Sequence, residues 1–227
     1  MPLQGVLRPP HGGRMRSGHP PDEVVRLNAG EFALAGKLLG SALHADPLWI
    51  AVIPDSARRP KLLTRMFTAL IRTTVVAQGV AEKTPDLEGV SLWFPPGRDM
   101  GLWAMVRAGF TMPRFVMNLP KSDRKLMMAV HRQVGERRKA LMPEPHWYVP
   151  AIGVDPESQG MGFGSALMAH GIARADRDET PIYLETETER NVSFYRQIGF
   201  DVIEEFTPNG VDIQMWLMAR QGTSSRP

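Results

Sequence analysis

The sequence predicts one mixed α/β domain, and three observations indicate this fold class. The chain has 227 residues, of which 43% are hydrophobic and 22% charged, as in an ordinary globular domain. Short apolar runs typical of strands alternate with longer segments whose apolar residues recur at helical spacing. Two strand-like runs, 146–154 and 181–187, are joined by a segment of helical character, which favours a parallel pair.

The first part of the domain is predicted to contain a strand, two helices and then two strands. EVVRLN (23–28) is typical of a strand, and 31–43 and 61–78 place apolar residues on one helical face. PLWIAVIP (47–54) is a short apolar run bounded by prolines. GVAEK and EGVSLWF are strand-like and are separated by the turn signal TPD.

The middle of the chain, 98–141, is predicted to be helical and is rich in methionine. Six methionines lie here: Met100, Met105, Met112, Met117, Met127 and Met128. We interpret them first as core filling, because Met adapts to irregular gaps. The alternative is a plastic apolar wall for a substrate or acyl chain.

From residue 146 onward, the chain is predicted to alternate strands and helices. HWYVPAIGV (146–154) is predicted as a strand, a helix runs to about residue 177, and PIYLETE (181–187) is the next strand. A short helix in NVSFYRQIGF then leads into the strand FDVIEEF, and VDIQMWLMAR forms the last strand.

Composition narrows the classes of function. The chain has no cysteine, which excludes thiolate metal sites and a cysteine nucleophile, and its six histidines show no H-x-x-x-H spacing, so we expect no metal. No apolar run reaches the roughly 20 residues of a membrane span. We therefore expect a cytoplasmic protein without a membrane partner.

The termini are predicted to lie outside the domain. Residues 1–20 carry Arg8, Arg14 and Arg16 and no acid, and their content of Pro, Gly and Arg is typical of a disordered leader or an added segment. Without them the formal charge of +3 falls to 0, so we expect no nucleic-acid partner. The predicted single domain spans 22–220, with a flexible tail at 221–227.

Three glycines at alternate positions in ESQGMGFGSALM (157–168) precede good helix formers. Glycines before a helix N-terminus favour a phosphate ligand, although a plain tight turn is the alternative. A mononucleotide P-loop is excluded because no Lys follows. A dinucleotide site is disfavoured despite Glu185, because Ser165 holds the third-glycine position and five residues separate strand from glycines.

The stretch Gln159–Gly164 resembles the Q/R-x-x-G-x-G/A signature of the GNAT superfamily of acyl-CoA-dependent N-acyltransferases. Val154-Asp155-Pro156, Asn191-Val192-Ser193-Phe194-Tyr195 and Gly199-Phe200 are similar to that superfamily in type, order and spacing. The resemblance is strong over 146–220. A weaker one over 22–145, carried by SLWFPPG and PHWYVPAIGV, is to the branch of puromycin acetyltransferase-like enzymes.

The resemblance implies a mostly antiparallel sheet with a splayed central parallel pair, flanked by helices, and acetyl-CoA as the acyl donor. Main-chain groups of Ile152 and Val154 would bind the thioester and the pantetheine arm, and Gly153 between them could mark a bulge. Asn191 would bond the pantetheine arm, cap a helix, or both. The residues expected to hold the pyrophosphate are Gln159, Gly160, Met161, Gly162, Phe163, Gly164 and Ser165.

A primary amine acceptor is mostly protonated at neutral pH and needs a base. Tyr183, Glu185 and Glu187 share one strand face by alternation, and two carboxylates together can raise one pKa. We favour Glu185 as base, with His146 as its rival; each could instead have a structural role. The resemblance makes Tyr195 the proton donor to the leaving thiolate and a ligand of the cofactor, with simple aromatic packing as the alternative.

The expected function is therefore direct transfer of an acetyl group from acetyl-CoA to a primary amine of a small molecule. Acetylation of protein N-termini or lysines is a second hypothesis, and a non-catalytic acyl-CoA sensor is a third. The protein is expected to be a monomer or a homodimer.

Overall fold

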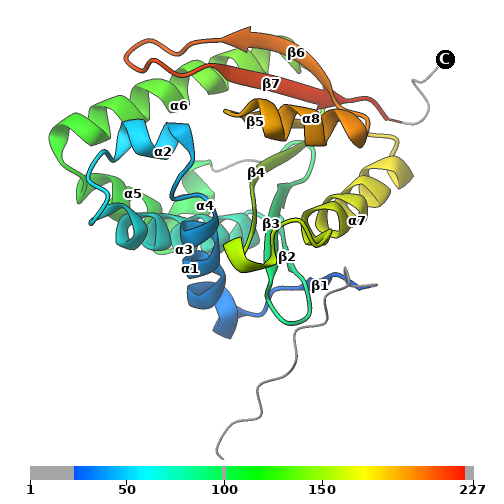
Figure 1. Ribbon diagram of the computed structural model, residues 1–227, viewed down its shortest axis with the longest axis horizontal. Coiled ribbons are helices and arrows are strands. Elements are labelled where there is room, and N and C mark those ends of the chain that lie inside the picture. Colours follow the sequence, from blue (N-terminus) through cyan, green and yellow to red (C-terminus); the bar gives the residue numbers. More distant parts are fainter. Residues whose placement is uncertain (1–22, 99–100, 223–227) are drawn as a thin grey trace, which may run out of the picture.

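A computed structural model of the chain describes residues 23–98 and 101–222, so the predicted leader and Met100 lie outside the described residues. These residues form a seven-stranded sheet in the order β1-β2-β3-β4-β5-β7-β6, with helices on both faces (Figure 1). The strands are β1 (Val25–Arg26), β2 (Val80–Lys83), β3 (Gly89–Phe94), β4 (Trp147–Val154), β5 (Ile182–Thr186), β6 (Asp201–Phe206) and β7 (Met215–Arg220).

Every described strand pair is antiparallel except β4 with β5. These two strands are paired over three residues, Trp147–Val149 against Ile182–Leu184, and the pairing stops there. The predicted sheet, mostly antiparallel with a splayed central parallel pair, is confirmed. The parallel geometry follows from the helix that connects the two strands.

The helices account for most of the remaining chain. They are α1 (Phe32–Ala42), α2 (Pro47–Val52), α3 (Arg59–Val76), α4 (Leu102–Arg107), α5 (Thr111–Met117), α6 (Lys121–Leu141), α7 (Phe163–Arg177) and α8 (Glu189–Gln197). The predicted helices 31–43 and 61–78 correspond to α1 and α3. The run PLWIAVIP contains α2, because Asp46 caps its first turn by accepting from the Leu48 N–H at 2.9 Å and Pro47 is pre-set for a helix start.

The predicted helical middle is three helices rather than one. Gly109 and Phe110 both have positive φ, +74° and +55°, which ends α4 and turns the chain into α5. Pro120 precedes α6 and cannot donate a backbone hydrogen bond. These breaks let α5 and α6 lie as two walls around a cavity instead of one straight rod.

The two faces of the sheet have separate cores. Helices α1, α2 and α3 pack with Val90 and Leu92 on one face, while α7 packs with Trp93 on the other (Figure 1). Close approach of α7 depends on Gly171, where an added Cβ would overlap the indole ring of Trp93. Helix α6 covers the sheet at β5–β7–β6, against Tyr183.

The predicted bulge at Gly153 is wrong. Gly153 is in register with Val90, and the irregularity lies further back, where β4 carries an extra residue around Val149 and Pro150. Pro150 lacks the N–H that regular pairing needs. Gly153 is required instead by α1, because an added Cβ would lie 2.9 Å from side-chain carbons of Leu39 and Ala42.

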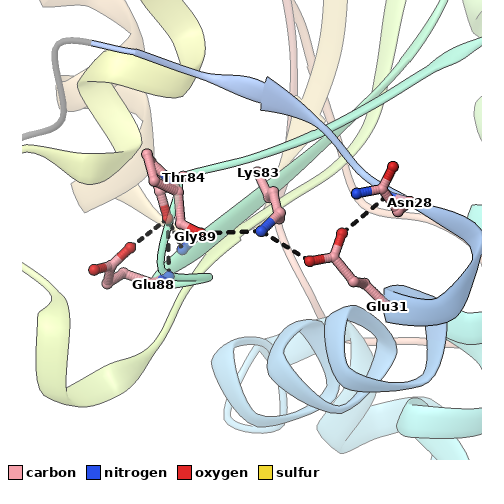
Figure 2. A network of polar contacts seen from close by, with 7 residues as sticks. Asn28, Glu31, Lys83, Thr84, Glu88 and Gly89 are labelled. Carbon is pink, nitrogen blue, oxygen red and sulfur yellow. Dashed lines mark hydrogen bonds and ion pairs between the residues drawn. The ribbon is translucent and has the colours of Figure 1, made fainter. Parts of the chain in front are cut away.

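A polar network fixes the N-terminal edge of the sheet (Figure 2). Glu31 accepts from the Asn28 N–H at 2.9 Å and forms a 2.9 Å ion pair with Lys83. On the β2–β3 turn, the Thr84 hydroxyl donates to Glu88 at 2.6 Å and accepts from the Glu88 N–H at 2.8 Å. These contacts anchor the start of α1, whose other end leads directly to Asp46.

Candidate active site

The glycine-rich loop forms one wall of a groove of about 610 Å³. Gly160 and Gly162 have φ of +79° and +85°, a conformation that side chains disfavour, and Gly162 caps the 15-residue helix α7. The free N–H groups of the first turn of α7 therefore border the groove, with the positive end of the helix dipole. This arrangement fits a pyrophosphate, as predicted from the sequence.

Most of the residues predicted to hold the cofactor line this groove. They are Ile152, Val154, Gln159, Gly160, Gly162, Phe163, Gly164, Ser165, Asn191 and Tyr195. Met161 is not among the lining residues, and its side chain is exposed. The Gln159 amide donates to the Val154 carbonyl at 3.2 Å and so ties the loop to the end of β4.

The end of β4 presents unpaired backbone groups to the same groove. The Asp155 N–H donates to the Glu88 carbonyl at 2.7 Å, so by alternation Gly153 also faces β3. Ile152 and Val154 then direct their N–H and C=O groups to the opposite edge, where β5 has diverged. An extended ligand can hydrogen-bond to this edge much as a further strand would.

A second cavity, of about 680 Å³, lies on the far side of the divergence. Seven methionines line it, and five of them come from the predicted methionine-rich middle: Met105, Met112, Met117, Met127 and Met128. The same cavity contacts Trp49 and Phe67, whose rings meet edge to face at 6.0 Å. Met112 and Met127 also pack on the core, as the core-filling interpretation predicts, and a wall for a substrate or acyl chain stays a prediction.

The groove and the cavity meet at a small set of shared residues. Leu43, Asp46, Ile152, Asn191 and Tyr195 line both. A donor bound in the groove and an acceptor bound in the cavity would therefore come into contact here. We call this set the junction.

Tyr195 is held at the junction by α8 and its aromatic neighbours. Its ring is buried and lies 5.2 Å from Phe194 and 5.7 Å from Phe200, between ring centres. Burial, and then the charges of Glu187 and Asp46, raise the pKa of Tyr195. The hydroxyl therefore stays protonated at neutral pH and can donate a proton or hydrogen bond.

Asn191 reaches the junction from the first turn of α8 but is not its cap. The N-cap is Thr188, whose side chain accepts from the Asn191 N–H at 3.3 Å, so the helix-cap interpretation of Asn191 is wrong. A Thr at the true N-cap leaves the Asn191 side chain available for a ligand.

Glu185 and Glu187 both line the second cavity. Burial raises the pKa of Glu185 to about 7, opposed by the nearby positive charge of Arg138 and by the hydroxyl of Tyr148. A carboxylate with that pKa is half ionised at neutral pH and can exchange protons readily. Tyr183 shares the face but lies deeper, and its hydroxyl interacts with the carboxyl group of Glu185.

Glu187 has a partner that the sequence analysis missed. Its carboxyl group is hydrogen-bonded to that of Asp46, and burial together with the charges of Asp46 and Glu185 raises the pKa of Glu187 well above its ordinary value. Burial also raises the pKa of Asp46. Two carboxyl groups in contact repel each other as anions, so a second negative charge is disfavoured and the pair can hold one proton between them.

His146 is not brought to the junction. It lines neither the groove nor the cavity; its Nδ1 lies 2.8 Å from the Glu144 carbonyl and its ring lies against Tyr183 at 5.9 Å. Burial lowers its pKa. Its role as base stays a prediction with little geometric support.

Within 23–98 and 101–222, no group of three His, Cys, Asp or Glu side chains could hold a metal ion. The helices of those same stretches include none that is both long and apolar enough to cross a membrane.

Comparisons with known proteins agree with this architecture. Residues 126–200 match the acetyltransferase (GNAT) family. An uncharacterised N-acetyltransferase of Schizosaccharomyces pombe is 26% identical over 182 residues, covering 77% of this chain and 72% of the relative.

Solved structures share the fold at low sequence identity. The crystal structure of histone acetyltransferase HPA2 and related acetyltransferase from Corynebacterium glutamicum has a TM-score of 0.63 at 23% identity, covering 92% of this chain and 98% of the other. Arylalkylamine N-acetyltransferase 2 of Aedes aegypti has a TM-score of 0.57 at 14% identity, over 88% and 98%. The polyamine N-acetyltransferase of Drosophila melanogaster has a TM-score of 0.56 at 14% identity, over 88% and 99%.

The fold and the junction between two substrate-sized spaces are those of an acyl-CoA-dependent acyltransferase. Residues 126–200 of the chain match the acetyltransferase (GNAT) family, and the similar proteins support an acyl-CoA-dependent N-acetyltransferase. Acetyl-CoA is the donor that this family uses.

Proposed function

We propose that the protein transfers an acetyl group from acetyl-CoA directly to the primary amine of a small molecule. The observation that carries the proposal is the junction, where a phosphate-binding groove and a separate apolar cavity meet at Asp46, Asn191 and Tyr195. Direct transfer is supported by the absence of any cysteine from the chain, which removes a thiol acyl-enzyme from consideration.

Donor binding would use the groove. The N–H groups of the glycine loop and the first turn of α7 would hold the pyrophosphate, and Asn191 with the free edge at Ile152 and Val154 would hold the pantetheine arm. The Ile152 N–H is in position to stabilise negative charge that develops on the thioester oxygen.

Proton transfers would use two groups of the acceptor side. Glu185, with its pKa of about 7, takes a proton from the ammonium group of the acceptor, directly or through water. The freed amine forms the C–N bond as the C–S bond breaks, and Tyr195 donates a proton to the departing sulfur. The proximity of both substrates at one junction supplies much of the rate enhancement.

The experiment that tests this proposal follows release of free CoA from acetyl-CoA with a thiol reagent. Because the chain has no cysteine, the reagent detects only CoA. Small primary amines are expected to accelerate release and yield acetamides identified by mass. Acetylation of peptides with no small amine accepted would instead support the hypothesis of a protein acetyltransferase. The resemblance to the puromycin acetyltransferase-like branch stays a prediction, which inclusion of an aminonucleoside would test.

A further inference from the structure

The charges around the acceptor cavity are unevenly placed. Three of the carboxyl groups that line it, those of Asp46, Glu185 and Glu187, lie at or beside the junction. Asp46 lines the donor groove as well, and Glu187 is hydrogen-bonded to it. A cationic group entering the cavity is therefore attracted to the end at which acetyl transfer would occur.

The opposite end of the cavity is apolar and carries a positive charge at its mouth. Met117 and Met128 are 72% and 57% exposed, so they mark the opening to solvent. Arg124 also lines the cavity, and its Nη1 donates to the Met117 carbonyl at 3.4 Å. The guanidinium group thus lies beside the exposed Met117.

Between the two ends, the walls are formed by the side chains of Met105, Met112, Met117, Met127 and Met128, which we call the methionine wall, and by Trp49 and Phe67. Unbranched thioether side chains adapt to ligands of different shape. Such a lining stabilises a bound ligand by burying its carbon atoms, and it offers few hydrogen-bond partners to a polar ligand.

We infer that the acceptor is an amine with one positive charge and an apolar carbon skeleton, an alkylamine or arylalkylamine. Its ammonium group binds beside the Asp46–Glu187 pair and its skeleton lies along the methionine wall. The inference rests on the proposed function and names the substrate class of that site. It assigns Asp46 to ammonium binding and Arg124 to the rejection of acceptors with a second cationic end.

The pair and the ammonium group match in charge. Asp46 and Glu187 share one proton, so together they offer one negative charge to one positive charge. A diamine would place its second ammonium group along the methionine wall or near Arg124, where it loses hydration and meets a like charge.

The test compares kcat/KM of the full chain for matched amines, with release of CoA as the readout. From butylamine through hexylamine to octylamine, kcat/KM is expected to rise by about fourfold for each added methylene group, since burial of one such group is worth about that factor. For hexylamine and 2-phenylethylamine, kcat/KM is expected to be at least about tenfold higher than for putrescine and agmatine.

Reversal of the charge at Arg124 provides a second test. Arg124→Glu is expected to raise the ratio of putrescine to hexylamine turnover by about tenfold, since it converts repulsion into attraction. Arg132→Glu is the matched control on the same helix, because Arg132 is exposed and does not line the cavity, and its ratio should equal that of the unaltered protein.

Each outcome has one interpretation. A preference for putrescine, agmatine or 6-aminohexanoate, or an alkylamine series without a trend, would overturn the inference and leave the proposed function standing. If acetyl-CoA binds by calorimetric titration and no small amine in the panel is acetylated, the proposed function itself fails.

Discussion

The carboxyl groups of Asp46 and Glu187 are in contact, although Asp46 caps a helix near the start of the domain and Glu187 follows a central strand. The shared proton makes a specific prediction. Asp46→Asn removes one of the charges that hold Glu187 protonated, and Glu187→Gln removes the carboxyl group that shares a proton with Asp46, so at pH 7 the remaining carboxyl group is expected to ionise. Each single variant keeps one negative charge and should change KM for hexylamine by less than about threefold.

The double variant has no charge in the pair, and its KM for hexylamine should rise at least about tenfold. Asn at position 46 can still accept from the Leu48 N–H, so the cap of α2 is kept. KM for acetyl-CoA should not move in any of the three variants. A single variant as impaired as the double would show that the pair does not share a proton.

Glu185→Gln should lower turnover about 100-fold near pH 7, within the range of general-base catalysis. The pKa of Glu185 is raised to about 7, so its basic form appears as pH rises through that value. Accordingly, kcat/KM of the unaltered protein should increase with pH across this window, and the deficit of the variant should shrink at high pH, where the amine is already free.

Glu204→Gln is a matched control for that experiment, since Glu204 pairs with Arg137 at 3.2 Å and lies outside both substrate spaces. His146→Gln should retain nearly full activity. A deficit of Glu185→Gln that is independent of pH would indicate an orienting role for this carboxylate.

Tyr195→Phe should reduce kcat by roughly 10²–10⁴-fold while KM for acetyl-CoA stays nearly constant. The variant retains the ring and its contacts with Phe194 and Phe200, so the midpoint of thermal unfolding should hardly change. Steady-state kinetics with an amine that the protein acetylates would measure kcat and KM of the variant. Full turnover at saturating substrates would mean that Tyr195 serves packing and that water protonates the thiolate.

Gly162→Ala should weaken binding of acetyl-CoA at least tenfold in calorimetric titration. The residue has φ of +85° in front of α7, where a side chain strains the backbone by roughly 1–2 kcal/mol and displaces the N–H groups that face the phosphate. Gly109→Ala, at φ of +74° in open space between α4 and α5, is the control for strain alone and should bind normally. An equal loss of acetyl-CoA affinity in both variants would show that backbone strain causes it and that the contact with the phosphate does not.

Gly171→Ala should lower the free energy of unfolding by roughly 1–3 kcal/mol, because the added methyl group overlaps the Trp93 indole ring inside a packed core. Gly135→Ala, in the interior of α6 with no atom near its Cβ position, should instead stabilise the protein by about 0.5–1 kcal/mol. Chemical denaturation of the two variants gives opposite shifts if the packing of α7 is as described.

Much of this architecture follows from local patterns in the sequence. The spacing of apolar residues predicted α1, α3 and α7, and the linking helix predicted that β4 and β5 are parallel. The glycines indicated the loop that we propose binds phosphate, because positive φ and a helix N-terminus are local properties. Features that depend on one or two neighbouring residues could therefore be predicted from the sequence.

What the sequence could not provide depends on distant contacts. Asp46 precedes Pro47, a signal sufficient to predict a helix cap, but nothing local indicates that Glu187 lies against it. The sequence predicted a bulge at Gly153 because glycine is typical of bulges. In the structure the extra residue of β4 lies near Pro150, and the missing side chain of Gly153 allows α1 to pack closely. The role of the methionines depended on where the breaks at Gly109 and Pro120 direct α5 and α6.

The divergence of β4 from β5 also leaves the sheet incomplete by one strand. A pantetheine arm lying along Ile152 and Val154 would fill that place, so the donor is part of the architecture as well as a reactant. Beyond their three paired residues, β4 and β5 would then be bridged by a molecule that leaves after each turnover. Amide hydrogens at this edge should exchange with solvent in the free protein and become protected in the loaded one, which makes this edge of β4 a direct reporter of donor occupancy.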